Sequence, residues 1–558
     1  MTAARPPALA AGARTAWWRA SAEARSVAAL ARAGYFGAEP PGRTLEMLRT
    51  LRAYGPFGAT PRIAALRHGD RPAIRDEAGE ITFAELDALA GRLANALIAR
   101  GLGPGSTIGI LCRNHRMPLA AAFAASRAGI SAVWLNTAFS APQLREVAAR
   151  EGVDLLVHDA EFDGLVAGLA PRHGRLRCLG EGDPAGTDPP EAAVDDVEAA
   201  LAAAGTHALP PPASPGRIVL LTSGTTGTPK GAPRAEPRSL TIPGALLDRM
   251  PLRAREATVI GPPVFHGTGL VIALLSLALG STLVLRRHFD PARLLDDVER
   301  HRATAICVVP VMLQRVLALG DEELARRDLG SLRVAFCAGA QLPGDVATRT
   351  MDRLGDVVYN LYGSTEVSVA TLATPADLRA APTTVGRPAL GSRVRVLGDD
   401  GRAVPAGRSG RIFVGTASPF EGYTGGGGKE VVDGLLATGD VGHLDAAGRL
   451  HVEGRDDDMI VSGGENVFPQ EVEELLLAHP GIADVATVGV PDDAFGQRLR
   501  AFVVLDPGAA VTGEQVRDLV RSNLAAYKVP REVAFVEEIP RNPTGKILRR
   551  ELAARPLS

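Results

Sequence analysis

Short runs of hydrophobic residues recur along the chain and alternate with amphipathic segments. The runs are rich in β-branched side chains, which is typical of buried strands, and the segments between them have helical spacing. The predicted strands are 108–111, 132–135, 155–158, 218–221, 305–309, 334–337 and 357–361, and the predicted helices are 84–101, 119–127, 141–151 and 270–279. This alternation favours an α/β fold with layered, mainly parallel sheets.

Four further regions have different patterns. Residues 11–51 have helical spacing, so a helical extension over 1–55 is predicted, which we expect to pack on its own domain. An amphipathic arm that touches a membrane surface is the alternative. Pro, Ala, Asp and Gly dominate 180–216, which predicts an exposed connection with little packed structure. Frequent glycines over 386–428 predict a β-rich subdomain with tight turns, and 443–452 is a predicted hairpin.

A charged string at Gly454-Arg455-Asp456-Asp457-Asp458 is typical of a domain boundary, because a short strand and a Gly-Gly break follow it. Beyond it the pattern predicts a small α+β unit. The expected helices are 469–478 and 513–524, and the expected strands are 485–490, 501–505 and 533–536. We therefore predict a large N-terminal domain, 1–455, and a small C-terminal domain, 456–558.

Composition narrows the function classes. With 558 residues the chain is expected to hold two or more domains, and 46% hydrophobic and 22% charged residues are typical of a globular protein. A formal net charge of -2 lacks the strong positive charge that is typical of nucleic-acid-binding proteins. The longest apolar run is too short for a membrane span, and the N-terminus lacks the apolar core of a signal peptide. We therefore expect a cytoplasmic protein without a stable membrane anchor.

The cysteines are scattered along the chain without the C-x-x-C spacing of metal or redox sites. They are Cys112, Cys178, Cys307 and Cys337, and each lies in apolar or mixed surroundings. The pattern predicts reduced, buried thiols that neither bind metal nor form disulfides.

A segment rich in hydroxyl side chains and glycine follows the predicted strand 218–221. It reads Thr222-Ser223-Gly224-Thr225-Thr226-Gly227-Thr228-Pro229-Lys230-Gly231. Glycines let backbone N–H groups approach phosphate oxygens, hydroxyls donate hydrogen bonds, and a lysine supplies positive charge. The P-loop spacing G-x-x-x-x-G-K-[ST] does not fit, so a Walker-type NTPase is disfavoured. A flexible linker is the alternative.

Two later turns suit the base and the metal of a nucleotide. The small residues Gly339 and Ala340 follow a predicted strand and leave room for an adenine ring to lie on the backbone. Another predicted strand ends in Tyr362-Gly363-Ser364-Thr365-Glu366, where an aromatic ring suits stacking, a hydroxyl suits a phosphate, and a carboxylate suits Mg²⁺.

Two further segments carry candidate ligand-binding side chains. Asp440, in Thr438-Gly439-Asp440, suits a grip on ribose hydroxyls, with a plain turn aspartate as the alternative. His266 precedes the apolar helix 270–279, and Gly267 and Gly269 follow it. A histidine with glycines at the mouth of a helix is a plausible pocket wall, and a structural histidine is the alternative.

These motifs resemble those of the adenylate-forming superfamily, which includes acyl-CoA synthetases, adenylation domains and luciferases. The resemblance rests on the segment 222–231, Tyr-Gly-Ser-Thr-Glu at 362–366, Thr-Gly-Asp at 438–440, the charged string from 454, and Pro-x-x-Pro-Thr-Gly-Lys ending at Lys546. The matches come in the family's order and cover about the last two thirds of the chain.

The resemblance implies a ligase that joins a carboxylic acid to ATP as acyl-AMP and then transfers the acyl group to coenzyme A. It implies site roles for residues of each motif. The phosphates would be held by Thr222, Ser223, Gly224, Thr225, Thr226, Gly227 and Lys230, and Mg²⁺ would be held by Glu366. The adenine and the phosphates would be contacted by Gly339, Ala340, Tyr362, Gly363 and Thr365. The ribose would be bound by Asp440 and Arg455. The catalytic residues would be Lys546, Glu366, Thr222 and His266, and the hinge between the domains would be Asp457. The path for CoA would be lined by Gly463 and Gly464, and the acyl pocket would be lined by His266, Gly267 and Gly269.

The acid is predicted to be a fatty acid or a bulky apolar acid, with the string from Gly463 to Pro469 resembling fatty-acyl-CoA synthetases. Three alternatives remain. The chain could be a stand-alone adenylating enzyme that serves a carrier protein, a ligase that performs one half-reaction, or a nucleotide-binding protein without catalysis. A homodimer is left open.

Overall fold

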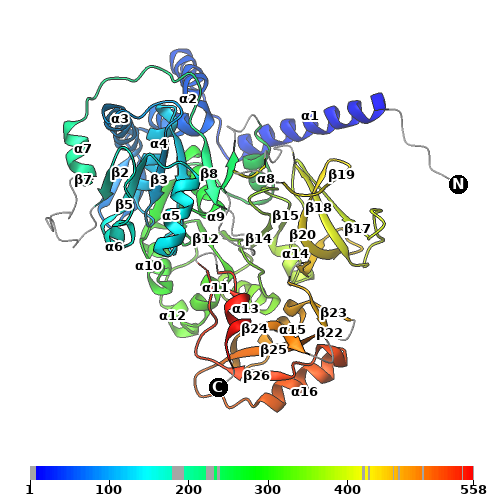
Figure 1. Cartoon of the computed structure of the whole chain (residues 1–558). Coiled ribbons are helices and arrows are strands. Elements are labelled where there is room, and N and C mark those ends of the chain that lie inside the picture. Colours follow the sequence, from blue (N-terminus) through cyan, green and yellow to red (C-terminus); the bar gives the residue numbers. More distant parts are fainter. Residues whose placement is uncertain are drawn as a thin grey trace. The chain divides into compact units, whose positions relative to one another are not determined.

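A computed structural model of the chain describes residues 8–178, 194–221, 231–234, 239–416, 422–424, 428–456, 458–462, 465–492, 496–542 and 545–556 (Figure 1). The chain forms two compact units that interleave in sequence. The first comprises Met1–Val308, Leu319–Ala335 and Ala417–Gly428, and the second comprises Val309–Ala318, Phe336–Thr416 and Lys429–Ser558. The predicted domain boundary at 455/456 stays a prediction.

The first unit contains a seven-stranded sheet whose neighbouring strands are parallel except at one edge. Its order is β7 (Val194–Asp196), β6 (Arg175–Cys178), β5 (Leu155–Asp159), β3 (Thr107–Leu111), β4 (Ser131–Trp134), β8 (Ile218–Leu221) and β9 (Gly231–Arg234). The associated helices are α3 (Phe83–Ala99), α4 (Arg116–Arg127), α5 (Ala141–Arg150), η1 (Ala160–Phe162), α6 (Asp163–Val166) and α7 (Val197–Ala203). The predicted alternation of strands and helices is confirmed.

A second group of strands in the first unit runs in the order β12 (Ala305–Val308), β10 (Ala257–Ile260), β11 (Thr282–Leu285), β1 (Pro72–Asp76) and β2 (Gly79–Thr82). The first four are parallel neighbours, and β2 closes the edge as an antiparallel hairpin with β1. Helices α8 (Thr241–Arg249), α9 (Gly267–Ala278), α10 (Pro291–His301) and α12 (Asp321–Ala325) also belong to this unit. Helix α3 begins at a capping box in which Thr82 and Glu85 satisfy each other's backbone N–H groups.

Two long helices form the N-terminal region, as the pattern predicted. They are α1 (Ala8–Arg32) and α2 (Pro41–His68), and α2 is interrupted where Gly55 adopts φ 67°. Helix α1 lies against α8, where Glu23 accepts a hydrogen bond from the backbone N–H of Leu240 at 3.1 Å. Gly244 of α8 is required there, because a Cβ atom would lie 2.3 Å from the Ser26 side chain.

The second unit is rich in β structure. Strands β14 (Val358–Tyr362), β15 (Thr371–Ala373) and β16 (Arg387–Pro388) are antiparallel neighbours, and a five-stranded antiparallel sheet contains β17 (Ser392–Leu397), β18 (Gly410–Thr416), β19 (Val431–Val432), β20 (Leu435–Leu444) and β21 (Leu450–Arg455). The predicted hairpin is formed by β20 and β21. Helices α11 (Pro310–Leu317), α13 (Gly344–Leu354) and α14 (Pro375–Ala380) belong to this unit, and β13 (Val334–Cys337) leads into it.

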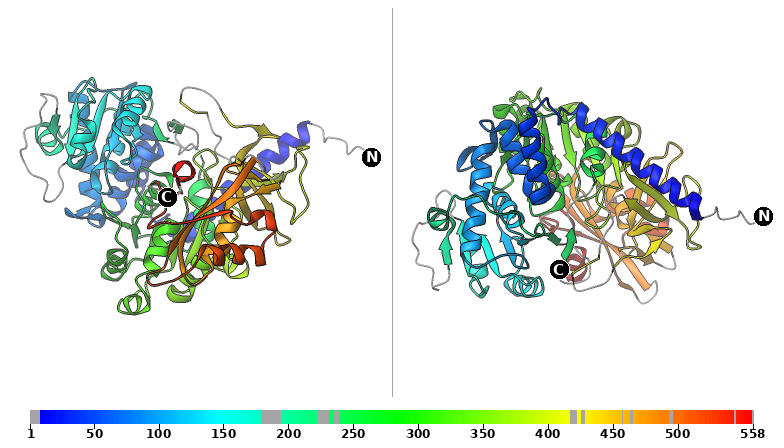
Figure 2. Two further views of the ribbon diagram at one scale, coloured as in Figure 1. Left: turned by 60° about the horizontal axis from the view of Figure 1, so that its bottom comes forward. Right: turned by 90° about the horizontal axis from the view of Figure 1, so that it is seen from above.

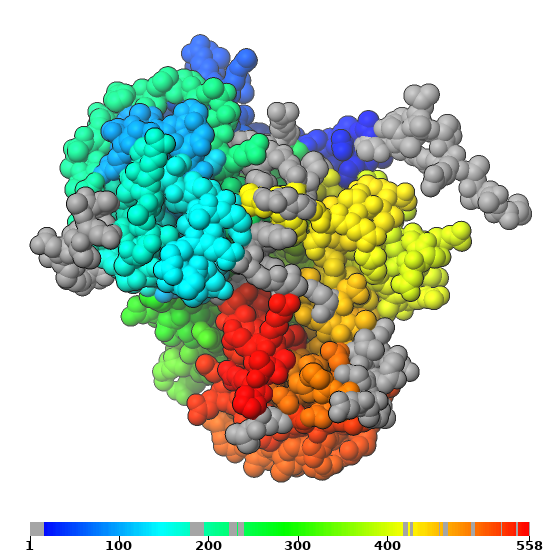
Figure 3. Space-filling view, viewed as in Figure 1, coloured from blue at the N-terminus to red at the C-terminus, as the bar shows by residue number. Residues whose placement is uncertain are grey.

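The last part of the second unit is the predicted α+β fold. Its sheet contains β22 (Ile460–Ser462), β23 (Glu465–Val467), β24 (Ile482–Asp492), β25 (Gly496–Leu505) and β26 (Glu532–Phe535). Its helices are α15 (Pro469–Leu477), α16 (Gly513–Asn523), η2 (Ala526–Lys528) and α17 (Arg549–Ala554). Figure 3 shows the C-terminal segment that contains α17, drawn in red, on the surface of this unit.

Two sequence-based expectations need comment. The segment 180–216 was expected to hold little packed structure, yet β7 and α7 lie within it, and Val197 is fully buried. The expectation was wrong there because the high content of Pro, Ala, Asp and Gly gave no sign of a short helix that covers a sheet edge. The expectation of buried thiols is confirmed, since Cys112, Cys178, Cys307 and Cys337 are all buried and unbridged. No helix among the described residues has the length and hydropathy needed to cross a membrane.

Candidate active site

The sequence-predicted site residues fall into three groups. The second unit contains Gly339, Ala340, Tyr362, Gly363, Thr365, Glu366, Asp440, Arg455 and Lys546. The first unit contains His266, Gly267 and Gly269. Thr222 to Lys230, the predicted hinge Asp457, and Gly463 with Gly464 lie outside the described residues.

Asp440 lies at the centre of the group in the second unit. It is on β20 directly opposite Arg455 of β21, and the Arg455 Nη1 atom is 3.5 Å from the Asp440 Oδ1 atom. The Tyr362 hydroxyl, at the end of β14, donates a hydrogen bond of 2.5 Å to the Asp440 Oδ2 atom. Gly439 adopts φ +85°, and a Cβ atom there would lie 3.2 Å from the Arg455 guanidinium. Three strands thus hold one carboxylate in a fixed orientation.

Burial and charge act in opposite directions on this carboxylate. Burial raises the pKa of Asp440 above its ordinary value, while the Tyr362 hydrogen bond and the charges of Arg455, Lys546 and Lys429 oppose that rise. Burial and the neighbouring Asp440 carboxylate raise the pKa of Tyr362 well above its ordinary value. The tyrosine therefore stays neutral and acts as a hydrogen-bond donor.

Glu366 is presented by a tight turn after β14. Gly363 is required there, because a Cβ atom would lie 1.8 Å from the Ser368 carbonyl oxygen. The Ser364 hydroxyl donates a 2.7 Å hydrogen bond to the Glu366 carboxylate and accepts one of 3.2 Å from the Glu366 backbone N–H. These bonds form a local loop that sets the direction of the carboxylate.

Lys546 lies on a turn that is held at several points. The Asn542 N–H donates to the Lys546 carbonyl at 2.8 Å, and the Lys546 N–H donates to Asn542 Oδ1 at 2.9 Å. Arg541 donates to the Gly545 carbonyl at 2.9 Å and forms an ion pair of 2.7 Å with Asp484 of β24. Gly545 adopts φ +80°, and a Cβ atom there would lie 3.2 Å from the side chain of Val311. The backbone of Lys546 is therefore fixed by hydrogen bonds to Asn542.

The electrostatic surroundings of Lys546 connect it to the other candidate residues. Its side chain keeps contact with solvent, yet the dense protein around it and the Arg455 charge lower its pKa. The carboxylates of Asp440, Glu366 and Asp458 oppose that effect. The structure thus brings four predicted residues, Lys546, Arg455, Asp440 and Glu366, into one electrostatic cluster with Tyr362.

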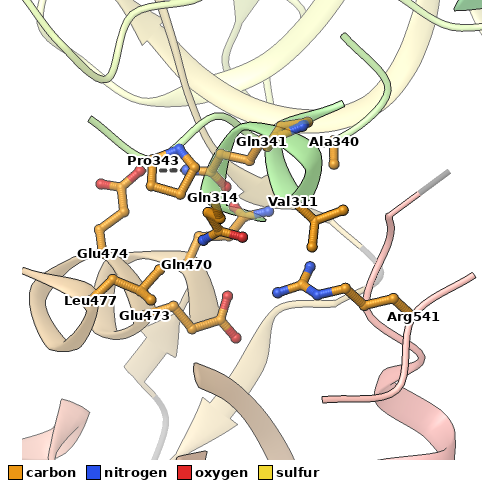
Figure 4. A pocket seen from close by; sticks show the side chains of 11 residues that line it. Val311, Gln314, Ala340, Gln341, Pro343, Gln470, Glu473, Glu474, Leu477 and Arg541 are labelled. Carbon is orange, nitrogen blue, oxygen red and sulfur yellow. Dashed lines mark hydrogen bonds between the residues drawn. The ribbon is translucent and has the colours of Figure 1, made fainter. Parts of the chain in front are cut away.

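Ala340, which follows Gly339 in the small-residue turn, lines a cavity of about 60 Å³ that has both apolar and polar side chains in its wall (Figure 4). Gly339 adopts φ +94°, and the neighbouring Gln341 donates a 2.5 Å hydrogen bond to Glu474 of α15. Burial raises the pKa of Glu474 to about 7, and the nearby charges of Glu473, Glu471 and Asp345 add to this rise. The hydrogen bond from Gln341 acts in the opposite direction and lowers the pKa. The cavity is lined by Pro310, Val311, Gln314, Ala340, Gln341, Pro343, Gln470, Glu473, Glu474, Leu477 and Arg541.

The predicted acyl-pocket residues lie at the start of α9 in the first unit. His266 is the residue before the helix, and its ring lies 4.5 Å from that of Phe265. A Cβ atom at Gly267 would meet one atom within 4 Å, Leu220 Cδ1 at 3.9 Å, whereas one at Gly269 would lie 2.7 Å from the Pro263 carbonyl oxygen. Gly269 thus has a packing reason to be glycine, and its place in an acyl pocket stays a prediction.

The acidic residues fit Mg²⁺ only together with a nucleotide. Mg²⁺ prefers a few carboxylates combined with water and substrate phosphates. Among the described residues, the group of three that could hold a metal ion is Cys112, Asp159 and Cys178. Burial raises the pKa of Cys112, and Asp159 is engaged by His115 at 2.7 Å, so this group does not suit a hard cation. Glu366, a single carboxylate beside Lys546, suits Mg²⁺ that arrives with ATP.

Two charged residues beside the site were not singled out from the sequence. Lys429 donates to the Thr438 carbonyl at 3.4 Å and acts on the Asp440 carboxylate. Asp458 acts on Lys546, and its N–H donates to the Arg455 carbonyl at 3.2 Å. Asp458 stands in the charged string already noted, so its proximity to Arg455 was a usable signal. Lys429 follows a glycine run, and nothing in its sequence context indicated a place beside the site.

Comparison with known proteins places the chain in a family. Residues 62–424 match the AMP-binding enzyme family, and residues 471–546 match the AMP-binding enzyme C-terminal domain. The chain belongs to the AMP-binding enzymes, and the prediction of the adenylate-forming superfamily is confirmed. The prediction of an ATP-dependent, AMP-forming acid–CoA ligase is confirmed at the level of enzyme class.

Three similar proteins show the range of the family. Feruloyl-CoA synthase of Amycolatopsis sp is 35% identical over 505 residues, which cover 89% of this chain and 96% of that protein. The fatty acid–[acyl-carrier-protein] ligase ScoC of Streptomyces coeruleorubidus is 31% identical and covers 87% of this chain and 93% of its own. The o-succinylbenzoate CoA synthetase MenE of Bacillus subtilis has been solved in complex with the acyl-adenylate intermediate OSB-AMP. That structure matches with a TM-score of 0.77 at 26% identity, and the match covers 89% of this chain and 98% of that one.

Proposed function

We propose that the chain activates a bulky apolar carboxylic acid with ATP to acyl-AMP and transfers the acyl group to coenzyme A. The observation that carries the proposal is the cluster of Tyr362, Asp440, Arg455, Glu366 and Lys546 in the second unit. It combines an oriented carboxylate for a ribose with two cations for anionic groups, which is the set of charges that adenylation needs.

Asp440 is proposed to accept hydrogen bonds from the ribose hydroxyls. Its carboxylate is fixed by Tyr362 on one oxygen, and Arg455 approaches the other at 3.5 Å. The hydroxyl of Tyr362 is occupied by this bond, so its ring face is the part proposed to stack on the adenine, beside Gly339 and Ala340. Thr365 and Gly363 are proposed to border the phosphates from the same turn.

Lys546 is proposed to promote the first half-reaction. A carboxylate oxygen of the acid attacks the α-phosphorus of ATP, the bond from that phosphorus to the pyrophosphate oxygen breaks, and pyrophosphate leaves. Two anions must approach each other in this step, and a lysine between them reduces their repulsion. The lowered pKa of Lys546 reflects burial and Arg455, so arriving phosphate and carboxylate groups favour its charged form.

The segment Thr222 to Lys230 is proposed to hold the phosphates, and Thr222 and Lys230 to contact the reacting part of ATP. Mg²⁺, held by Glu366 and the phosphates, would neutralise phosphate charge when bound. The motifs and the family membership support these assignments.

The second half-reaction is proposed to use a different placement of the C-terminal part of the chain. The CoA sulfur attacks the acyl carbon of acyl-AMP, the carbon–oxygen bond to AMP breaks, and AMP leaves with that oxygen. Lys546 serves the first step only, so rotation about Asp457 is proposed to remove it and to bring Gly463 and Gly464 beside the pantetheine arm. His266 and Gly267 are proposed to border the acyl group.

The nature of the acid rests on two kinds of support. Gly267 has few neighbours around its Cβ position, and Val367, which follows Glu366, is buried and apolar. A relative named for feruloyl-CoA and a structure that contains OSB-AMP favour a bulky acid with a ring, and the relative named for fatty acids keeps a fatty acid as an option.

The test is mass spectrometry of the products made from ATP, Mg²⁺ and a panel of aromatic, alicyclic and fatty acids. Each acid is incubated with CoA, without CoA, or with a purified acyl carrier protein. We expect acyl-CoA with CoA and acyl-AMP without it. Acyl-AMP that moves only to the carrier protein would contradict the CoA proposal and favour the carrier-dependent alternative, which the similarity to ScoC supports.

A further inference from the structure

The exposed large hydrophobic side chains of the described residues are concentrated near the N-terminus. Six of them lie between residues 17 and 51, while five are spread over the rest of the described chain. The six are Trp17, 74% exposed, Val27, 43%, Phe36, 51%, Leu45, 48%, Leu48, 60%, and Leu51, 40%. Isolated exposed apolar residues need no explanation, but a concentration in two helices and their connection does.

Folding of the first unit does not require these side chains. The inner face of α1 is already formed by Ala22, Ser26, Ala29 and Leu30, which are buried. Asp248 of α8 forms ion pairs of 3.3 Å with Arg25 and Arg32, which fix the helix further. The exposed apolar residues of α1 and α2 are therefore available for another purpose.

On α2, the exposed residues form one stripe. Leu45, Leu48 and Leu51 follow one another at three-residue spacing, which places them along a slowly turning face of a helix. Arg49 and Arg52 are also exposed and fall on the same side of the helix at its 100° per residue. Leucine and arginine side chains are therefore interspersed on this face.

The charge of this region is opposite in sign to that of the whole chain. Residues 17–52 contain six arginines and three glutamates, whereas the chain has a net charge of -2. Glu46 is neutralised by Arg62 at 2.5 Å, and Glu39 is neutralised by Arg43 and Arg67. Within the part of the chain that the structure describes, Arg19, Arg49 and Arg52 form no ion pair, so they leave positive charge beside the apolar side chains.

Both helices lie on the same side of the first unit. They occupy its top in Figure 1, and both face the viewer in the right-hand view of Figure 2. We call the exposed stripe of α2 the basic–apolar face and define it by Leu45, Leu48 and Leu51 with Arg49 and Arg52.

We propose that the basic–apolar face binds the surface of an anionic phospholipid bilayer. Leucine side chains enter the region between headgroups and acyl chains, while arginines pair with lipid phosphates. The arginines are spread between the leucines, so the face offers apolar and cationic groups side by side, as a bilayer surface with anionic headgroups requires. Binding of this kind is reversible and peripheral. If the proposed function holds, it brings the enzyme to the place where apolar acids accumulate.

The test is flotation of the full chain with two kinds of vesicle, one of phosphatidylcholine alone and one with 30% phosphatidylglycerol, at low and high salt. We expect binding to the anionic vesicles that falls at least tenfold at 0.5 M NaCl. The triple variant Leu45→Gln, Leu48→Gln, Leu51→Gln should bind at least tenfold more weakly. The pair Arg49→Gln, Arg52→Gln should lose the preference for anionic vesicles.

A matched control replaces two exposed apolar residues elsewhere, Ile98→Gln and Phe535→Gln, and should bind as the unaltered chain does. Equal melting temperatures show that each variant is folded. Absence of vesicle binding at low salt, or equal binding by the leucine variant, would overturn the proposal. Sedimentation without lipid distinguishes a further outcome: a dimer of the unaltered chain that the leucine variant abolishes would assign the face to a second copy and overturn the lipid assignment.

Discussion

The strand pair that carries Asp440 and the turn that carries Lys546 hold opposite charges by different means. Asp440 is fixed by cross-strand pairing with Arg455 and by the Tyr362 hydroxyl, all on β-strands. Lys546 is held by a β-bridge between Arg541 and Ile547 and by the side chains of Arg541 and Asn542. Burial raises the pKa of Asp440 and lowers that of Lys546, so desolvation opposes both charges. The proposed function gives the strand pair a role in both half-reactions and gives Lys546 a role in the first alone.

The first prediction concerns the turn. Lys546→Ala removes the cation proposed to bring the carboxylate and the α-phosphate together, so adenylation should fall by about 1,000-fold, by analogy with loss of one preorganised donor. Thioester formation from supplied acyl-AMP should change less than about threefold, because Lys546 is proposed to act only in adenylation. Single-turnover assays of each half-reaction measure both rates.

Lys528→Ala is the matched control, because Lys528 lies in the same C-terminal part and is paired with Glu471 at 2.5 Å. It should leave both half-reactions unchanged. Equal loss of both half-reactions in Lys546→Ala would show that the lysine holds the nucleotide throughout, and the contrast with Asp440 would disappear.

The second prediction concerns the strand pair. Asp440→Asn removes the charge but keeps the shape of a ribose ligand, so each half-reaction should slow by about 100-fold, since a charge-assisted hydrogen bond is roughly twice as strong as a neutral one. Asp433→Asn, at an exposed turn with φ 50°, is the control and should have no effect. A defect confined to adenylation would contradict the idea that the strand pair serves both steps.

The third prediction tests how the turn is held. Arg541→Ala removes the hydrogen bond to the Gly545 carbonyl and the ion pair with Asp484. Lys546 itself remains, so adenylation should fall by about tenfold through poorer positioning, with a small change in the KM for ATP. The exposed Arg550→Ala is the control. An unchanged kcat for adenylation in Arg541→Ala would show that Arg541 does not position Lys546.

The fourth prediction concerns pH and is the smallest. Burial raises the pKa of Glu474 from 4.5 to about 7, so the folded chain binds a proton between these values that the unfolded chain does not. Its contribution to stability is present below pH 4.5 and is lost as the pH rises towards 7. Glu474→Gln mimics the protonated form, and it should therefore raise the free energy of unfolding at pH 8 by about 1 kcal/mol relative to its effect at pH 5.

Urea unfolding at pH 5 and pH 8 measures this difference. Glu538→Gln makes the same chemical change at an exposed site and should show no dependence on pH over this interval. A pH-independent effect of Glu474→Gln would mean that the burial around the Gln341 contact does not hold in solution.

Sequence patterns predicted most elements because the apolar runs of the sheets are continuous and the turns are marked by glycine. The candidate residues Asp440, Glu366 and Lys546 could be found because each lies in a short motif that resembles a family signature. The reason for Gly363 and Gly439, close approach of backbone or of a guanidinium, is visible only in the fold.

Contacts between distant segments could not be predicted. The bond from Tyr362 to Asp440 joins residues 78 positions apart, and that from Gln341 to Glu474 joins residues 133 apart. Nothing local to Glu474 indicates that its carboxyl is desolvated, since charged residues on a helix are usually solvated. The helix α7 was missed because its surroundings are rich in proline, alanine and glycine, although Val197 and Ala200 give it a buried face.

The central claim is that the acid is activated as an acyl-adenylate and then released to CoA. The most direct measurement follows oxygen from an acid labelled with ¹⁸O in its carboxylate, using mass spectrometry of the AMP, pyrophosphate and acyl-CoA. The account predicts one ¹⁸O atom in AMP and none in pyrophosphate, because the carboxylate oxygen bonds to the α-phosphorus and stays there when the thiol displaces AMP. Unlabelled AMP together with acyl-CoA, or label in pyrophosphate or phosphate, would contradict it.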